Sequence, residues 1–194
     1  MFLNIITPSV RFENLKIISD SIKIPKDNYR WIVVFDLDEI PSEEYIPNNC
    51  EVYCIKDNRG NPDGAGNGGP GSVAGNAQRN FALNLIEKGY VYFNDDDTTI
   101  HKDLWDNIKD IDSEIDFISF DQELKDGSFR LNGSVIKLSH TDSHNFISSI
   151  EIIGDIRWVT ELYWADGIFA EQCYSRSNNS IYIPKILSTY NSLR

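Results

Sequence analysis

The sequence contains no cluster of Lys and Arg residues, and its 30 acidic residues outnumber its 18 basic ones. The formal net charge of −12 argues against a broad electrostatic attraction to nucleic acid or to an anionic bilayer. No hydrophobic run approaches the length of a membrane span, and the first residues have neither a basic lead nor a small-residue cleavage site. We therefore expect no nucleic-acid partner and no stable membrane insertion.

Cysteine is also scarce. The three cysteines, Cys50, Cys54 and Cys173, form no Cys-x-x-Cys pair of the kind that ligates metals, and an odd number of them suits a reducing compartment. We therefore interpret the chain as a cytoplasmic protein. Its 194 residues fit one domain with a sizeable core, and neither an internal repeat nor a linker marks a second domain.

Two nucleotide-binding motifs are absent from the Gly-rich stretch between Asp57 and Gly75. The stretch has no G-x-x-x-x-G-K-[ST] pattern, which argues against a P-loop, and no G-x-G-x-x-G directly follows the first expected strand. Its Asp and Asn residues are similar to those of a calcium loop, but the EF-hand spacing and the terminal Glu are missing. We interpret the stretch as a loop close to a ligand.

The first half of the chain alternates between strand-like and helix-like segments. Runs of apolar and β-branched residues predict strands, and apolar residues three or four positions apart predict helices. Strands are expected at 3–7, 29–36, 51–57 and 90–93, and helices at 12–22, 76–88 and 101–111. This order is typical of an α/β sandwich with a mostly parallel sheet, whose ligands bind beyond the carboxyl ends of the strands.

The second half is less regular and predicts an additional β element. Short strands or hairpin arms are expected at 116–120, 127–131, 134–138, 144–153 and 180–186, with one helical segment at 161–174.

Carboxylates follow two of the strands that are expected to be buried. Asp36 closes the second strand, and Asp95, Asp96 and Asp97 follow the fourth. Because the carboxyl ends of parallel strands meet at one edge of a sheet, we expect these side chains to share a crevice. Hard oxygen ligands of this kind suit Mg²⁺ or Mn²⁺ together with substrate phosphates. The alternative is a solvated acidic turn, or an Asp97 that caps the next helix.

Other residues have a functional and a structural interpretation. Arg79, early in the helix after the Gly-rich stretch, is a candidate cation for these carboxylates and for a diphosphate, or else a surface arginine. His140 and His144 stand four residues apart, as metal ligands on a helix do, but the polar residues around them favour a loop. Trp158 and Trp164 offer aromatic faces to a sugar or base, although buried tryptophans are commoner.

Taken together, these segments resemble a small GT-A fold glycosyltransferase of the family 2 type. The strongest match is "GNAQRNFALNLIEKGYVYFNDDDT", which is similar to that family's Arg-Asn, helix, Gly, strand and D-x-D, with Asp95 and Asp97 as the two D-x-D positions. "NIITPSVRFENLKIISDSI" resembles its first strand, Pro and helix, and "WIVVFD" its second strand, which ends in the aspartate that binds the base. "YIPKILSTYNS" resembles its last strand.

The resemblance implies a GT-A three-layer sandwich that forms a single catalytic domain over residues 1–194. Residues 1–100 would be the nucleotide-binding half and residues 101–194 the acceptor-binding half. Mn²⁺ or Mg²⁺ would be held by Asp95 and Asp97, and UDP or dTDP sugars are favoured as donors. The residues implied to contact the nucleotide sugar are Thr7, Pro8, Asp36, Arg79, Asp95 and Asp96.

The resemblance also implies a catalytic base. "GDIRWVTELYWADGIFAE" is similar to the family segment that ends in a Glu-Asp pair whose Asp takes a proton from the acceptor hydroxyl, which makes Asp166 the base of an inverting displacement. The pair in this chain is Ala-Asp rather than Glu-Asp. Trp158, Tyr163 and Trp164 are implied as acceptor contacts. The structural alternative for Asp166 is a cap on a helix that begins near Gly167.

Two other functions remain as alternatives. A sugar-phosphate nucleotidyltransferase also uses metal-binding aspartates, but it places its Gly-rich loop directly after the first strand, where this chain has "TPSVRFEN". A non-enzymatic module that binds calcium or carbohydrate through its acidic loops is the other.

Overall fold

The structure is a computed structural model that describes residues 1–57 and 75–194. The loop predicted between Asp57 and Gly75 therefore lies almost entirely outside the described residues. The strands are β1 (Leu3–Ser9), β2 (Tyr29–Phe35), β3 (Glu51–Cys54), β4 (Tyr90–Phe93), β5 (Phe117–Leu124), β6 (Phe129–Leu131), β7 (Phe146–Ser149) and β8 (Ser180–Tyr190). The helices are α1 (Leu15–Ser21), α2 (Asn76–Leu83), α3 (Leu104–Ile108), α4 (Ile150–Ile153) and α5 (Ala165–Arg176), with short 3-10 turns at η1 (Phe12–Asn14), η2 (Lys26–Asn28) and η3 (Glu43–Tyr45).

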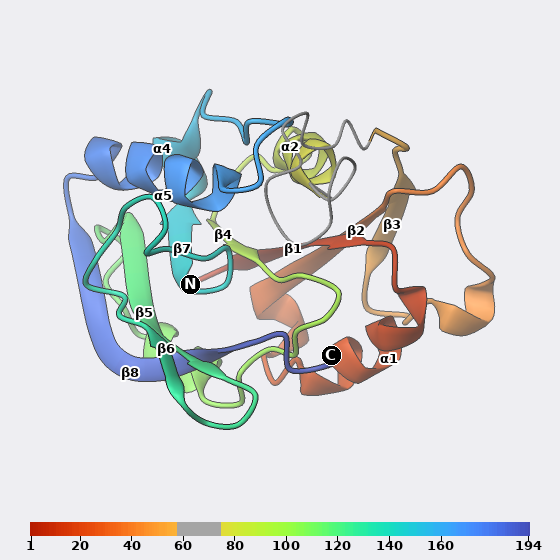
Figure 1. Cartoon of the computed structure of the whole chain (residues 1–194), viewed down its shortest axis with the longest axis horizontal. Helices are drawn as coiled ribbons and strands as arrows, with labels where there is room; N and C mark the ends of the chain where they lie inside the picture. The colour runs from red at the N-terminus through yellow and green to blue at the C-terminus, as the bar shows by residue number, and fades with distance from the viewer. Residues whose placement is uncertain (58–74) are drawn as a thin grey trace.

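The strands form one mixed sheet that runs through both halves of the chain (Figure 1). β1 pairs in parallel with β2 and β4, and β2 pairs in parallel with β3. β7 is antiparallel to both β4 and β5, so it joins the two halves, while β8 runs parallel along β5. β6 pairs with the end of β5 as the small additional β element. The predicted α/β fold with a mostly parallel sheet is confirmed.

The sheet is covered on both faces, which gives three layers. In β1, the side chain of Ile5 packs in one hydrophobic cluster with α1 and α3, and that of Ile6 packs in the other with α2 and α5. Successive residues of a strand point to opposite faces, so a strand buried on both faces is apolar along most of its length. Figure 1 shows α2, α4 and α5 on one side of the sheet and α1 on the other.

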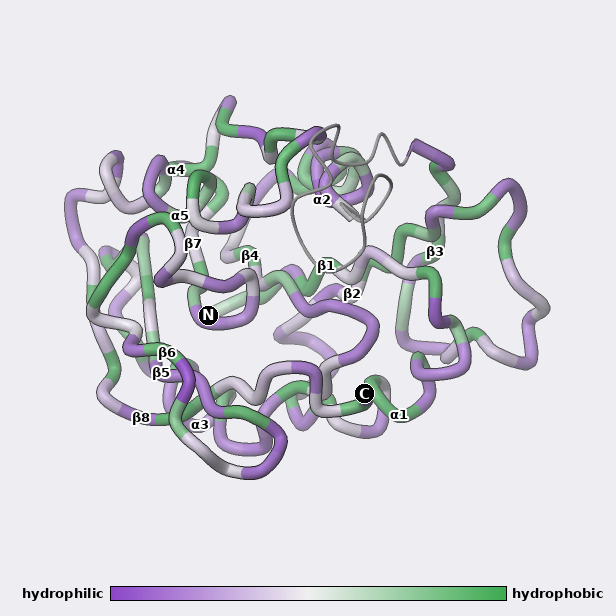
Figure 2. The backbone as a smooth tube through the Cα atoms, viewed as in Figure 1, coloured by the Kyte–Doolittle hydropathy of each residue, from purple (hydrophilic) through white to green (hydrophobic). Residues whose placement is uncertain are grey.

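Hydrophobic residues follow this layering along the chain. Figure 2 shows green stretches along the central strands and purple ones mainly in the connections between elements. Within residues 1–57 and 75–194, no helix has both the length and the apolar character that crossing a membrane requires.

The second half departs from the prediction in two segments. Residues 134–138 form turns rather than a strand, because backbone groups bond locally: the Lys137 N–H donates to Thr141 Oγ1 at 3.1 Å. The segment at 144–153 is split into β7 and α4, and Ser149 begins the helix by accepting a hydrogen bond from the Ile152 N–H.

Candidate functional site

A cleft of about 890 Å³ brings the two halves of the chain together. It lies at the ends of β1, β2 and β4, where the parallel strands finish, and the start of α5 closes it from the second half. The predicted site residues that line it are Pro8, Asp36, Arg79, Asp95, Asp96, Asp97, Trp158, Tyr163, Trp164 and Asp166. Sequence positions more than 150 residues apart therefore meet in one place, as the topology of a parallel sheet predicts.

Thr7 is the predicted site residue that does not line the cleft. Its side chain is buried, and its Oγ1 accepts a hydrogen bond from Trp31 Nε1 at 2.9 Å. The structure thus places the Thr7 side chain in the core behind the cleft, because the alternation of β1 turns it inward. Pro8 and Asp36 do line the cleft, and the Asp36 N–H donates to the Ser9 carbonyl at 3.0 Å, which keeps these two strand ends together.

The three adjacent aspartates have different partners. Asp96 Oδ2 accepts hydrogen bonds from the Val10 and Arg11 N–H groups, both at 2.7 Å, and Asp96 Oδ1 lies 2.6 Å from Arg11 Nη1. Its carboxylate thus ties the end of β1 to the end of β4. This geometry favours a structural role for Asp96 over a direct contact with a donor, since protein groups already satisfy both oxygens.

Asp97 is buried and faces cations. Its Oδ2 lies 2.6 Å from Arg194 Nε and 3.5 Å from Arg11 Nη1. Burial raises the pKa of Asp97, and the neighbouring Asp95 carboxylate adds to this, whereas Arg194 acts in the opposite direction. The alternative that Asp97 caps the next helix is wrong, because α3 begins several residues later. A buried carboxylate in this position requires a positive partner.

Asp95 is bound to Arg79. The Arg79 guanidinium, only 5% exposed, donates through Nη2 to Asp95 Oδ1, reaches Asn76 Oδ1 at 3.1 Å, and stacks 4.5 Å above the Trp158 ring. Burial alone would raise the pKa of Asp95, but the Arg79 guanidinium opposes it and holds the pKa well below its usual range. Asp95 is therefore ionised at neutral pH, and the surface interpretation of Arg79 is wrong.

Asp142 and His144 belong to the same site, although the sequence interpretation placed His144 only in a polar loop. His144 is 1% exposed, and its Nε2 accepts a hydrogen bond from the Asp95 N–H at 2.9 Å. Its Nδ1 lies 3.0 Å from Asp142 Oδ1. With Nε2 as the acceptor, the proton of the neutral ring is on Nδ1, where it faces the Asp142 carboxylate. His140 is exposed, so the two histidines do not share a metal.

Arg130 binds Asp142 and lies on the far side of the cleft. Its Nη1 lies 2.9 Å from Asp142 Oδ2, and its guanidinium stacks 3.7 Å from the centre of the Tyr190 ring. Both Arg130 and Tyr190 line the cleft. The sequence signal for this network was weak, because its members lie on β5, β6, β8 and the turn before β7, and only the sheet brings them together.

Asp166 lies in the first turn of α5 at the opposite wall of the cleft. Its Oδ1 accepts a hydrogen bond from the Gly167 N–H at 2.7 Å. Burial raises its pKa to about 7, and the carboxylate of Asp142 adds to the increase. A carboxylate with a pKa near neutrality suits a general base. The capping alternative is wrong in its position, because Trp164 is the residue at the N-cap.

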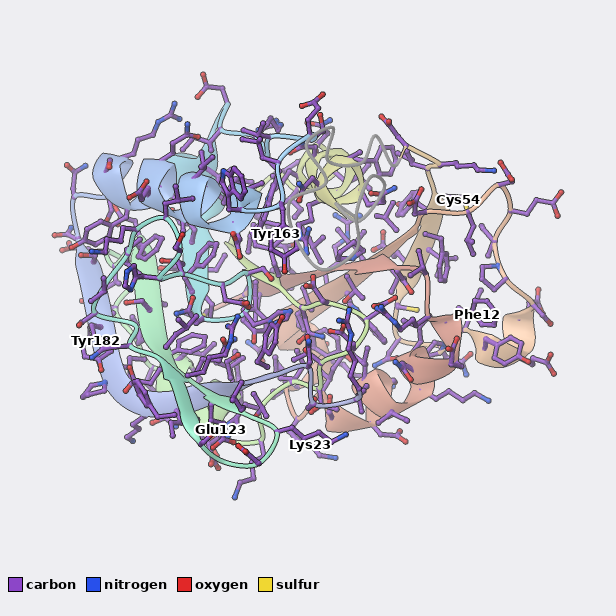
Figure 3. All side chains as sticks on the ribbon, viewed as in Figure 1. Phe12, Lys23, Cys54, Glu123, Tyr163 and Tyr182 are labelled. Carbon is purple, nitrogen blue, oxygen red and sulfur yellow. The ribbon has the colours of Figure 1, made fainter. Side chains whose placement is uncertain are left out.

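The predicted acceptor residues differ in exposure. Tyr163, labelled in Figure 3, and Trp164 are 47% and 38% exposed, so both present aromatic surface at the mouth of the cleft. Trp158 is 3% exposed and stacks on Phe169 with ring centroids 4.8 Å apart. Trp158 therefore supports Arg79 from the core, and the common structural interpretation of a buried tryptophan applies to it.

No group of three or more His, Cys, Asp or Glu residues that could enclose a metal ion occurs within residues 1–57 and 75–194. Asp95 and Asp97 both line the cleft and lie close enough for the carboxylate of Asp95 to raise the pKa of Asp97. That set fits Mg²⁺ or Mn²⁺, which typically take one or two carboxylates and complete their coordination with water and substrate phosphates.

The fold occurs in solved structures of low sequence identity. TarS from S. aureus, residues 1–349, matches with a TM-score of 0.75 and 20% identity over 97% of this chain and 60% of that chain. The complex of the same protein with UDP-GlcNAc matches with a TM-score of 0.72 and 20% identity, over 97% and 58% of the two chains. The mannosyltransferase PcManGT from Pyrobaculum calidifontis, with GDP-Man and Mn²⁺, matches with a TM-score of 0.68 and 12% identity, over 97% and 56%.

These matches show that the chain has the GT-A type of glycosyltransferase fold, as the resemblance implied. The chain spans about 60% of the length of the TarS 1–349 structure. No protein-family profile and no curated protein sequence matches the chain.

Proposed function

We propose that the chain is a glycosyltransferase that moves a sugar from a nucleoside-diphosphate sugar to an acceptor hydroxyl, with inversion and with the help of a divalent cation. One observation carries the proposal. The cleft holds an ionised carboxylate, Asp95, beside Asp97 on one wall, and a carboxylate with a pKa near 7, Asp166, on the other. Two walls with carboxylates of different basicity fit donor activation on one side and proton removal on the other.

The donor side is built from the first half of the chain. Pro8 and Asp36 would flank the base and ribose, and Asp95, held by Arg79, would face the ribose or a metal-bound water. Asp97 would ligate Mn²⁺ or Mg²⁺. When bound, the cation neutralises the diphosphate and stabilises the negative charge that develops on it as it leaves. A diphosphate in a protein with a net charge of −12 requires such local help.

The acceptor side is built from the second half. Asp166 takes the proton from the acceptor hydroxyl as the hydroxyl oxygen attacks the anomeric carbon. The bond between that carbon and the diphosphate oxygen breaks, and its electron pair stays on the diphosphate. Attack from the face opposite the leaving group inverts the carbon. Tyr163 and Trp164, exposed at the mouth of the cleft, would contact the acceptor.

We further infer that residues 1–194 act as one catalytic domain, because both halves share one sheet and line one cleft. Cys50, Cys54 and Cys173 are all free, which fits the cytoplasmic location expected from the sequence.

Calorimetry with nucleoside diphosphates tests the proposal. UDP or dTDP should bind in the presence of Mn²⁺ and much more weakly without it. Without the cation, the carboxylates of Asp95 and Asp97, which form the donor wall of the cleft, repel a free diphosphate. UDP should bind more tightly than GDP, since the N–H of uracil can donate to the Asp36 carboxylate. Equal or tighter binding of GDP would contradict the base assignment. Binding of Ca²⁺ or glycans without any nucleotide binding would favour the non-enzymatic alternative.

Gly167→Ala should lower transfer by about tenfold or more through a displacement of Asp166. A Cβ at position 167 would lie 2.8 Å from Leu138 Cα, a backbone atom that cannot move aside alone. The start of α5, and with it the proposed base, must then shift. Turnover of a nucleotide sugar and UDP affinity, measured side by side, check this.

Gly127→Ala is the matched control for adding a methyl group at a glycine, because nothing lies within 4 Å of its Cβ position. Its left-handed φ of 82° costs some stability, but it is not expected to alter transfer.

A further inference from the structure

The chemistry proposed above gives the buried pair of Asp142 and His144 no contact with the donor or the acceptor. The imidazole of His144 lies in the turn before β7, between two carboxylates, with Nε2 3.3 Å from Asp95 Oδ2 and Nδ1 3.0 Å from Asp142 Oδ1. Nε2 also accepts the hydrogen bond from the Asp95 N–H at 2.9 Å. The ring therefore connects the second half of the chain to the first aspartate of the donor wall.

Asp142 is itself held from several directions. Its Oδ2 lies 2.9 Å from Arg130 Nη1, and its Oδ1 accepts hydrogen bonds from Gln122 Nε2 at 3.2 Å and from the His144 N–H at 3.1 Å. The Asp142 N–H donates to Asn145 Oδ1 at 3.1 Å. The carboxylate beside the imidazole is thus anchored to β5 and β6, and the position of the ring is set by the second half.

We propose that His144, oriented by Asp142, is a positioning residue that fixes the backbone of Asp95 and through it the turn that carries Asp97. This inference rests on the proposed function. The Thr98 N–H donates to the Asp95 carbonyl at 3.1 Å, which closes the turn directly after Asp95. A backbone N–H that loses its buried acceptor is costly, so the turn would shift to find another partner. A shift at Asp95 would move Asp97 as well.

The carboxylates on both sides of the ring are themselves held in place. Arg79 pairs with Asp95, and Arg130 pairs with Asp142. The position of His144 Nε2 beside the Asp95 N–H is therefore fixed from both halves of the chain.

Two variants of similar volume test the proposal. His144→Gln keeps an oxygen that can accept from the Asp95 N–H, whereas His144→Met fills the space without such an acceptor. With UDP and Mn²⁺ in the calorimeter, the Met variant should bind about tenfold more weakly than wild type, and the Gln variant should stay within about threefold, as the loss or retention of one hydrogen bond predicts. His140→Gln, at the exposed histidine of the same segment, is the matched control and should bind like wild type.

The outcomes separate this inference from the proposed function. A wild-type protein that binds no nucleoside diphosphate with Mn²⁺ would overturn both. A wild type that binds UDP, together with a folded Met variant that binds it equally well, would overturn the inference alone. If the Met variant does not fold, the Gln variant decides: near-wild-type affinity supports the role of the acceptor, and a loss beyond about tenfold with an unchanged melting temperature rejects it.

Discussion

Asp166→Asn should reduce sugar transfer by roughly 10² or more while donor binding stays intact. The amide has the size of the carboxylate and its oxygen can still accept from the Gly167 N–H, which lies at 2.7 Å, but it cannot take a proton from the acceptor. The affinity for UDP with Mn²⁺ and the melting temperature should both hold, because the donor wall is formed by other residues. Initial rates with the UDP-sugar that the wild type turns over fastest measure the loss.

The pH dependence gives an independent check on the same residue. Burial, reinforced by Asp142, raises the pKa of Asp166 to about 7, so the carboxyl group becomes protonated as the pH falls through neutrality. A base must be ionised to act, and turnover should therefore fall about tenfold for each pH unit below 7. The residual activity of the Asn variant should not show this decrease below pH 7.

Asp155→Asn is the matched control for this substitution. Asp155 is an exposed aspartate that pairs with Arg176 at 2.6 Å, outside the cleft, and its loss should leave turnover unchanged. Near-normal turnover in Asp166→Asn would return Asp166 to a local role at the start of α5 and would show that another group takes the proton.

Asp97→Ala should abolish the Mn²⁺ dependence of UDP binding and weaken binding in the presence of Mn²⁺ by roughly 10² or more. The substitution removes the buried carboxylate that can ligate the cation. It also releases Arg194, which lies 2.6 Å from Asp97 in the present structure, whereas Arg11 stays paired with Asp96 at 2.6 Å. Any binding that persists without metal would come from the Arg194 guanidinium, so titrations with and without Mn²⁺ should coincide.

Two further titrations make this result specific. Asp110→Asn changes an exposed aspartate outside the cleft and should retain wild-type affinity and metal dependence. A melting curve for Asp97→Ala shows whether the released Arg194 disturbs the fold. If a folded Asp97→Ala protein bound UDP with Mn²⁺ as tightly as wild type, the assignment of the metal to the D-x-D aspartates would fail.

Local sequence pattern was sufficient for the first half of the fold. β2 carries an apolar run at 31–35 and β4 is apolar throughout, as burial on both faces of a sheet favours, whereas β1 is buried although it includes Asn4, Thr7 and Ser9. Each of the three strands ends at or near a polar residue that lines the cleft. The place of Asp36 and of Asp95–Asp97 at one edge followed from the same pattern, because parallel strands bring their carboxyl ends together.

The second half could not be placed in this way. Residues 134–138 include the β-branched Val135 and Ile136, yet they form turns and irregular structure. The backbone before them is fixed by Gly133, which packs directly against the Phe120 backbone and whose N–H donates to Asp121 Oδ1 at 2.9 Å. A Cβ at position 133 would lie 2.4 Å from the Phe120 carbonyl oxygen. This contact depends on β5, which lies outside any local window of sequence.

The sequence by itself determined which charged residues lie at the cleft and which strand ends they follow. The tertiary structure alone decided what each charge does: Asp96 binds backbone N–H groups, Asp95 is kept ionised by Arg79, and Asp166 is desolvated until its pKa is about 7. The physical reason is that a carboxyl group titrates according to its burial and its neighbours. Both are set by elements that are distant along the chain and adjacent only in the folded protein.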